Sequence, residues 1–132
     1  MKLPLNAGDE WSETQDSLLS GVVTPPSKRC FLVKFLPFEN GCFIVVSEGS
    51  NKIGGMYVSI STSNKIDTAK VIPSKYDSMF ISTLSQRVAS LTNGICIVCI
   101  HGLEKLQLDD MKSIMEKVIG MVEKSNEKNP IK

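Results

Sequence analysis

The sequence lacks the charge imbalance that marks proteins of nucleic acid or membrane surfaces. Its 132 residues carry 15 Lys and Arg against 14 Asp and Glu, which gives a formal net charge of +1. A chain without a basic excess has no general electrostatic attraction to phosphate backbones or anionic lipid. We therefore expect no nucleic-acid partner.

Long hydrophobic runs are also missing. No apolar stretch approaches the roughly 20 residues that a helix needs to span a bilayer. Residues 1–10 contain no apolar segment of the length found in secretory signals, and no Asn-x-Ser/Thr acceptor occurs in the chain. These absences predict no membrane contact and a cytoplasmic location, which could extend to the nucleus.

Residues that carry chemistry are scarce. The chain has a single histidine, His101, with no fixed nucleophile or carboxylate beside it in the sequence. Asp109 and Asp110 are adjacent, so on a helix they diverge by about 100° and cannot act as a carboxylate pair. Gly54-Gly55 lacks the Gly-Lys-Ser/Thr ending of a phosphate-binding loop. We expect no catalytic residues and no cofactor.

Two of the four cysteines, Cys96 and Cys99, have the Cys-x-x-Cys spacing of metal and redox sites. They lie in the apolar run 95–100, which predicts a strand. Residues three apart on a strand point to opposite faces of the sheet, so these thiols cannot share a metal ion. We expect them to be small buried hydrophobic residues, and we expect no metal site.

What the sequence does contain is a hairpin that is apolar on both of its faces. Residues 30–36 and 42–46 run almost without a polar break, and Asn40-Gly41 between them is well suited to a tight turn. A strand with one face in water should alternate apolar and polar residues. Some other element must therefore cover each face of this hairpin.

Periodicity along the chain predicts the remaining elements. A short strand is expected near residues 18–23, further strands at 56–60, 66–72 and 95–100, and helices at about 77–92 and 108–124. The expected fold is α+β, with a single mostly antiparallel β-sheet of five to six strands and two helices packed on one face. We divide the chain into a flexible arm at 1–14, one domain at 15–124 and a flexible tail at 125–132.

A two-residue turn divides the hairpin into two sets of side chains. The set expected to lie under the helices comprises Phe31, Val33, Phe35, Ile44 and Val46. The other face carries Ser47 and the residues that we predict to form a partner interface, namely Leu32, Lys34, Leu36, Phe43 and Val45. Large apolar side chains mixed with a few polar ones are the composition expected of a surface that meets another protein.

Three stretches resemble the proteasome assembly chaperone 3 family: Lys52–Ile60, Thr68–Ile72 and Leu103–Ile119. Residues 84–93 are also similar to the sister chaperone 4. The resemblance implies one antiparallel sheet with two helices on one side and dimerisation through the other. It also implies a protein without catalytic activity that forms a heterodimer with a sister chaperone and binds an α-subunit while the 20S proteasome α-ring assembles.

Two other classes of function stay open. A small α+β scaffold or adaptor, profilin-like or roadblock-like, would bind a cytoskeletal or GTPase partner. A small-molecule enzyme or carrier would use the second face of the sheet to line a pocket, although few convergent polar groups are available for one. A heterodimeric assembly chaperone is the leading hypothesis.

Overall fold

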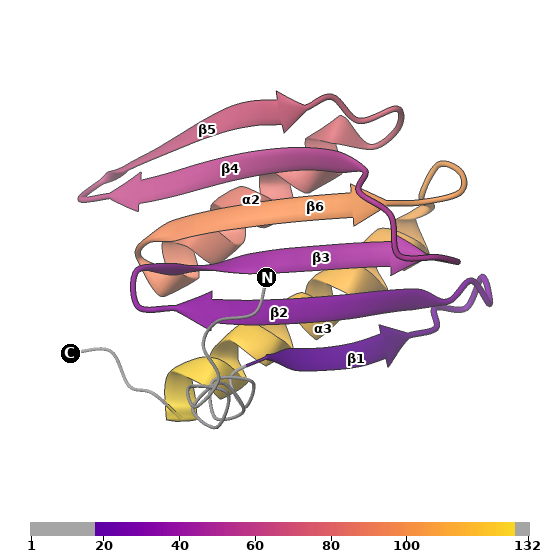
Figure 1. Cartoon of the computed structure of the whole chain (residues 1–132), viewed down its shortest axis with the longest axis horizontal. Coiled ribbons are helices and arrows are strands. Elements are labelled where there is room, and N and C mark those ends of the chain that lie inside the picture. The colour runs from indigo at the N-terminus through magenta and orange to yellow at the C-terminus, as the bar shows by residue number, and fades with distance from the viewer. Residues whose placement is uncertain (1–17, 129–132) are drawn as a thin grey trace, which may run out of the picture.

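Six strands and two helices make up residues 18–128, the part of the chain that the computed structural model describes (Figure 1). The strands are β1 (Leu19–Val23), β2 (Phe31–Phe38), β3 (Gly41–Glu48), β4 (Gly55–Thr62), β5 (Lys65–Ile72) and β6 (Ile95–His101). The helices are α2 (Ser78–Thr92) and α3 (Leu108–Lys128).

All six strands join one sheet in the order β1-β2-β3-β6-β4-β5. β3 and β6 run parallel, whereas every other neighbouring pair is antiparallel. β6 therefore lies between two hairpins, β2–β3 and β4–β5, and joins them into a continuous sheet. This confirms the predicted α+β fold with a mostly antiparallel sheet, which is mixed because of the one parallel pair.

The turn of the β2–β3 hairpin lies one residue earlier than expected. Phe38 pairs with Gly41, so the two-residue loop is Glu39–Asn40 and not Asn40-Gly41. Moving a two-residue loop by one position changes each pairing by two residues, and residues two apart on a strand share a face. The predicted division of side chains between the two faces is correct for this reason, although the turn was misplaced.

Gly41 belongs to the strand because β6 passes very close to it. A Cβ atom added at Gly41 would lie 1.8 Å from the carbonyl oxygen of Ile95, and one added at Gly94 would lie 2.3 Å from that of Asn40. The amide of Ile95 donates a hydrogen bond of 2.9 Å to Asn40 O. The glycine that suggested a turn thus allows the parallel pair β3–β6 to begin.

Both helices lie on the same side of the sheet, behind it in the view of Figure 1. Asn93, with φ 53°, ends α2 in the left-handed conformation. Asp77 precedes α2, but its carboxylate makes no cap hydrogen bond. Asp77 Oδ2 instead accepts a hydrogen bond of 3.0 Å from the amide of Leu106, in the loop before α3.

The core lies between the helices and the side of the sheet that they cover. Every residue predicted for this side is at most 2% exposed: Phe31, Val33, Phe35, Ile44 and Val46. Helix residues that are 0% exposed complete the core, among them Leu84 and Val88 of α2 and Ile114, Val118 and Val122 of α3. The predicted helix-covered set is therefore confirmed.

Helix α3 continues to Lys128, four residues past the predicted end at 124. The arm at 1–14 lies outside the described residues, as do residues 129–132 of the tail, so the division into arm, domain and tail stays a prediction. Neither described helix has the length and hydropathy needed to cross a membrane.

Candidate functional site

The side of the sheet that faces away from α2 and α3, here called the open face, is the candidate functional site. Its side chains line up in rows because the strands are in register. One row crosses five strands and is entirely apolar: Leu36, Phe43, Ile97, Val58 and Ala69. No helix or strand within residues 18–128 packs over this row.

The predicted interface residues all lie on the open face. Two cross-strand pairs, Leu36 with Phe43 and Lys34 with Val45, sit side by side, and Leu32 pairs with Ser47 next to them. All five predicted residues are half-buried, which is the exposure expected where only neighbouring side chains give shelter. Their role in binding a partner stays a prediction.

Further members of the open face come from strands distant in the sequence. β6 contributes Ile97, and β4 contributes Met56 and Val58, all of them half-buried. Sequence reasoning missed them because it could not place β6 between β3 and β4. The available signal was the run 95–100, which has no polar residue and therefore had to be apolar on both faces.

One end of the open face is closed by the connection between β3 and β4. Ser47 Oγ donates a hydrogen bond of 3.3 Å to Asn51 Oδ1, and the amide of Gly54 donates one of 3.4 Å to Cys99 Sγ. As a result Ser47 is 3% exposed and Cys99 is 2% exposed. Figure 1 shows this connection passing in front of the end of β6. The accessible part of the open face is therefore centred on β2, β3, β6 and β4.

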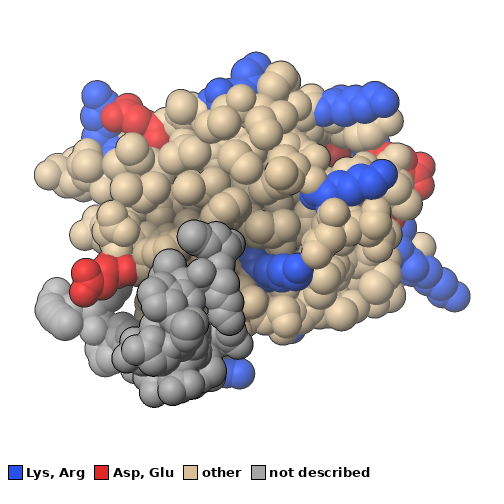
Figure 2. Space-filling view, viewed as in Figure 1, with Lys and Arg blue, Asp and Glu red and all other residues tan. Residues whose placement is uncertain are grey.

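Charge is nearly absent from the four inner strands of the open face, whereas the edge strand β5 carries Lys65 and Asp67 on this side. Figure 2 shows it as a broad uncharged area with Lys and Arg concentrated towards its margins. Within β2, β3, β6 and β4, Lys34 is the only Lys, Arg, Asp or Glu on this side. An apolar surface with one ammonium group suits another protein surface better than it suits a polar small molecule.

The cysteines have the arrangement that the sequence predicted. Cys96 pairs with Cys42 on the helix-covered side, whereas Cys99 pairs with Val45 on the open face, so the two point in opposite directions. Cys42 and Cys96 are buried with their sulfur atoms 3.9 Å apart. The hydrogen bond between them and their burial raise the pKa of Cys96, which disfavours the reactive thiolate form.

His101 ends β6 at the covered end of the open face. Its Nε2 atom is buried and has no hydrogen-bond partner among the described atoms. Across residues 18–128, no three His, Cys, Asp or Glu side chains are grouped so that they could hold a metal ion.

A cluster of buried charges, which the sequence did not reveal, fastens α3 to the sheet. Arg29 donates hydrogen bonds of 2.8 and 2.7 Å to the two carboxylate oxygens of Glu48 and one of 3.0 Å to Asp110 Oδ2. Arg29 also donates to the carbonyl oxygens of Glu104 and Lys105. Asp110 is 0% exposed.

The ionic states in this cluster follow from these contacts. Hydrogen bonds from Arg29 hold the pKa of Glu48 below its ordinary value, against the effect of burial. Burial by itself would raise the pKa of Asp110, but hydrogen bonds from Ser27, the Gln107 amide and Arg29 lower it overall. The groups of this cluster are therefore charged, and their contacts hold α3 against the sheet.

Comparison with known proteins adds one similarity. No protein-family model and no curated protein matches the sequence. A solved structure described as "Crystal Structure of a Novel Chaperone Complex for Yeast 20S Proteasome Assembly" is similar at a TM-score of 0.48 and 14% identity, over 84% of this chain and 94% of that chain. A similarity of this size is too weak to establish a shared fold or a shared function.

Proposed function

We propose that this protein is a non-enzymatic assembly chaperone that uses the open face to pair with a sister chaperone. The observation that carries the proposal is the apolar row from Leu36 to Ala69, which no described helix or strand covers. Burying such side chains against a partner yields about 25 cal/mol for each Å² of apolar surface removed from water.

The size of the open face suits a protein partner. From β2 to β5 there are four inter-strand gaps of about 4.8 Å, and eight-residue strands are about 27 Å long. The projected area is therefore about 500 Å² before side-chain relief is counted, using the same spacings. Specific complexes bury about 800 Å² on each partner, so this face can form the core of an interface of ordinary size.

The identity of the partner rests on the sequence resemblance to proteasome assembly chaperones. Under this proposal the heterodimer binds a proteasome α-subunit transiently in the cytoplasm while the 20S α-ring assembles. No catalytic step is part of this function.

The direct test is capture of the tagged chain from cells of its source, with mass spectrometry of the associated chains. The wild-type chain is expected to recover a sister chaperone and proteasome α-subunits. Leu36→Asp and Phe43→Asp place a carboxylate in the apolar row and should abolish pairing while circular dichroism still reports a folded chain.

A matched control keeps that test specific. Met79→Asp makes the same kind of change at a residue of α2 that is 80% exposed and lies on the helix side of the molecule, so pairing should persist. If Leu36→Asp and Phe43→Asp keep their partner in light scattering, the open face is not the interface. Recovery of actin or GTPases in place of proteasome chains would favour the adaptor hypothesis.

A further inference from the structure

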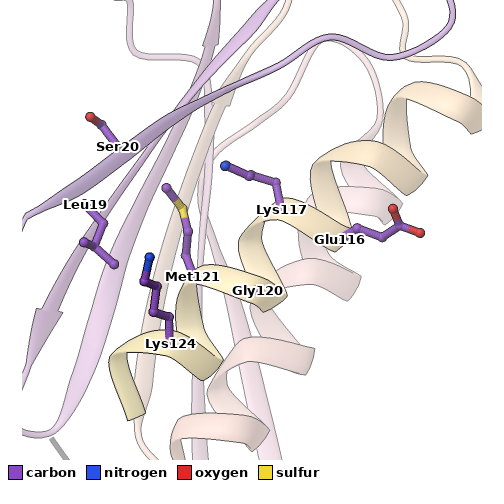
Figure 3. A pocket seen from close by; sticks show the side chains of 7 residues that line it. All are labelled: Leu19, Ser20, Glu116, Lys117, Gly120, Met121 and Lys124. Atoms are coloured by element: carbon purple, nitrogen blue, oxygen red, sulfur yellow. The ribbon is translucent and has the colours of Figure 1, made fainter. Parts of the chain in front are cut away.

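A groove between the edge strand β1 and helix α3 is the strongest remaining site on the described chain. It has a volume of about 230 Å³ and lies on the helix side of the sheet, away from the open face (Figure 3). The residues that line it are Leu19, Ser20, Glu116, Lys117, Gly120, Met121 and Lys124.

The groove is basic along one wall and apolar at its base. Figure 3 shows Lys117, Met121 and Lys124 pointing from α3 towards β1, whereas Glu116 points away. Met121 is 7% exposed and Leu19 is half-buried, so these two side chains form the apolar base. Two ammonium groups thus stand beside an apolar floor, and Glu116, the one carboxylate among the lining residues, is turned away from them.

Gly21 leaves the space that the Lys117 side chain occupies in this wall of the groove. A Cβ atom at Gly21 would lie 2.5 Å from Cε and 2.8 Å from Nζ of Lys117. Any larger residue at this position in β1 would displace the lysine. A glycine inside a strand weakens the strand and often marks a position that another group approaches closely. At Gly21 that group is the stem of the Lys117 side chain.

Gly120 keeps the groove open on the helix side. A Cβ atom added there would meet nothing within 4 Å, so the groove has free space beside Gly120. An occupant can therefore lie along α3 between Lys117 and Lys124, which are about 10 Å apart along the helix axis.

The sequence that precedes β1 contains a segment of complementary chemistry. Residues 9–16 read Asp-Glu-Trp-Ser-Glu-Thr-Gln-Asp, with four carboxylates, no basic residue and the only tryptophan of the protein, Trp11. This segment leads directly into Leu19, which lines the groove. Trp11 is seven residues before Leu18 and can reach about 23 Å from it when the chain is extended.

We propose that residues 9–16 dock within the chain into the β1–α3 groove, with their carboxylates against Lys117 and Lys124 and with Trp11 on the apolar floor. Because the segment is tethered beside its site, its effective concentration there is in the millimolar range, so weak contacts suffice. Docking would also shield the free edge of β1, which is otherwise a template for strand addition. The inference is independent of the chaperone proposal.

Trp11 fluorescence in the full-length chain tests this directly, because no other tryptophan contributes. The wild-type emission should be blue-shifted, and acrylamide should quench it less than it quenches N-acetyltryptophanamide. Raising the salt from about 0.1 to 1 M shortens the Debye length from about 10 to 3 Å and should remove much of the protection.

Paired charge removals identify the site. Lys117→Gln with Lys124→Gln should lower the ratio of docked to free segment about tenfold, the effect of losing two exposed ion pairs. Neutralising the segment with Asp9→Asn, Glu10→Gln, Glu13→Gln and Asp16→Asn should do the same. The control Lys70→Gln with Lys112→Gln removes two exposed charges outside the groove and should leave Trp11 protected, and circular dichroism verifies the fold of each variant.

Three outcomes would overturn the proposal. Solvent-like emission of Trp11 in the wild-type chain would show that the segment is not docked. Protection that survives Lys117→Gln with Lys124→Gln would place Trp11 somewhere else. Protection that disappears on dilution would show that the segment binds a second copy and not its own chain.

Discussion

The two sides of the sheet have similar apolar side chains and different surroundings. Val46 and Val45 are neighbours on β3, yet Val46 is 0% exposed under the helices, whereas Val45 is half-buried on the open face. An apolar strand pattern therefore does not by itself distinguish the core of the folded chain from a face that the described helices leave uncovered. One side is the protein's own core, and the other is, in our proposal, half of a shared core.

The two sides also differ in the polar contacts at their ends. The covered side is fastened by Arg29, Glu48 and Asp110, which link β3 to the start of α3. The open face has only the β3–β4 connection at one end, held by bonds such as that from the Gly54 amide to Cys99. The side of the sheet that the helices cover is therefore also the side that ion pairs hold to α3.

Removing that tie should give the largest effect on stability. Arg29→Met leaves Glu48 and Asp110 buried without their shared cation, which typically costs about 3–5 kcal/mol. Urea unfolding of the isolated chain, followed by circular dichroism, measures this loss. Arg87→Met, at an exposed position of α2, is the control and should change the unfolding free energy by less than about 0.5 kcal/mol.

The outcome decides how the covered side is held. If Arg29→Met unfolds with nearly the wild-type free energy, the ionic cluster is incidental and apolar packing alone holds α3. The difference in polar contacts between the two sides of the sheet would then have no effect on the free energy of unfolding.

The same truncation on opposite sides of one strand tests the comparison most directly. Val46→Ala removes two methylene equivalents from a filled core and should cost about 2 kcal/mol, including a cavity contribution. Val45→Ala should cost clearly less in the isolated chain, because its side chain is already partly exposed to water. Equal losses in urea unfolding would show that the open face is packed in the isolated chain.

The sequence predicted the fold and the division of the faces because both depend on local pattern. The period of apolar residues located the strands and helices, and the parity of a two-residue turn assigned Leu36 and Phe43 to one side even with the turn misplaced. What could not be predicted depends on pairing between distant segments. The position of β6, and with it Ile97 on the open face, follows from the β3–β6 pairing.

The ionic cluster was hidden for a similar reason. Arg29 and Asp110 are 81 residues apart, and neither has a local pattern that distinguishes it from an exposed charge. Only the packing of α3 on the sheet brings them together. Long-range polar contacts of this kind leave no periodic signal, unlike the apolar stripe of a helix.

Acid should weaken the covered side through the same cluster. The pKa values of Glu48 and Asp110 are lowered in the folded chain from ordinary values of 4.5 and 3.8. A carboxyl group with a lowered folded pKa stabilises the fold above its unfolded pKa, and this contribution disappears as the pH falls through the folded value. The unfolding free energy should therefore decline below about pH 5.

Arg29→Met supplies the control for this acid dependence. Without the guanidinium, the two carboxyl groups lose the contact that favours their charged forms, so the decline with acid should be shallower than in the wild type. Urea midpoints measured across a pH series compare the two chains. Parallel curves would show that other carboxyl groups govern the acid response.

The smallest expected effect concerns Lys34, the one ammonium group on the inner strands of the open face. Lys34→Met replaces it with an apolar side chain of similar length, so the free energy of unfolding of the isolated chain should change by less than about 0.5 kcal/mol. A small change is expected because Lys34 is only half-buried, and a lysine stem can lie along apolar neighbours while its ammonium group stays in water. A loss above about 2 kcal/mol in urea unfolding, a magnitude that requires a disrupted buried network, would show that the open face is already covered in the isolated chain. Both sides of the sheet would then be covered in the isolated chain, and the contrast between them would be lost.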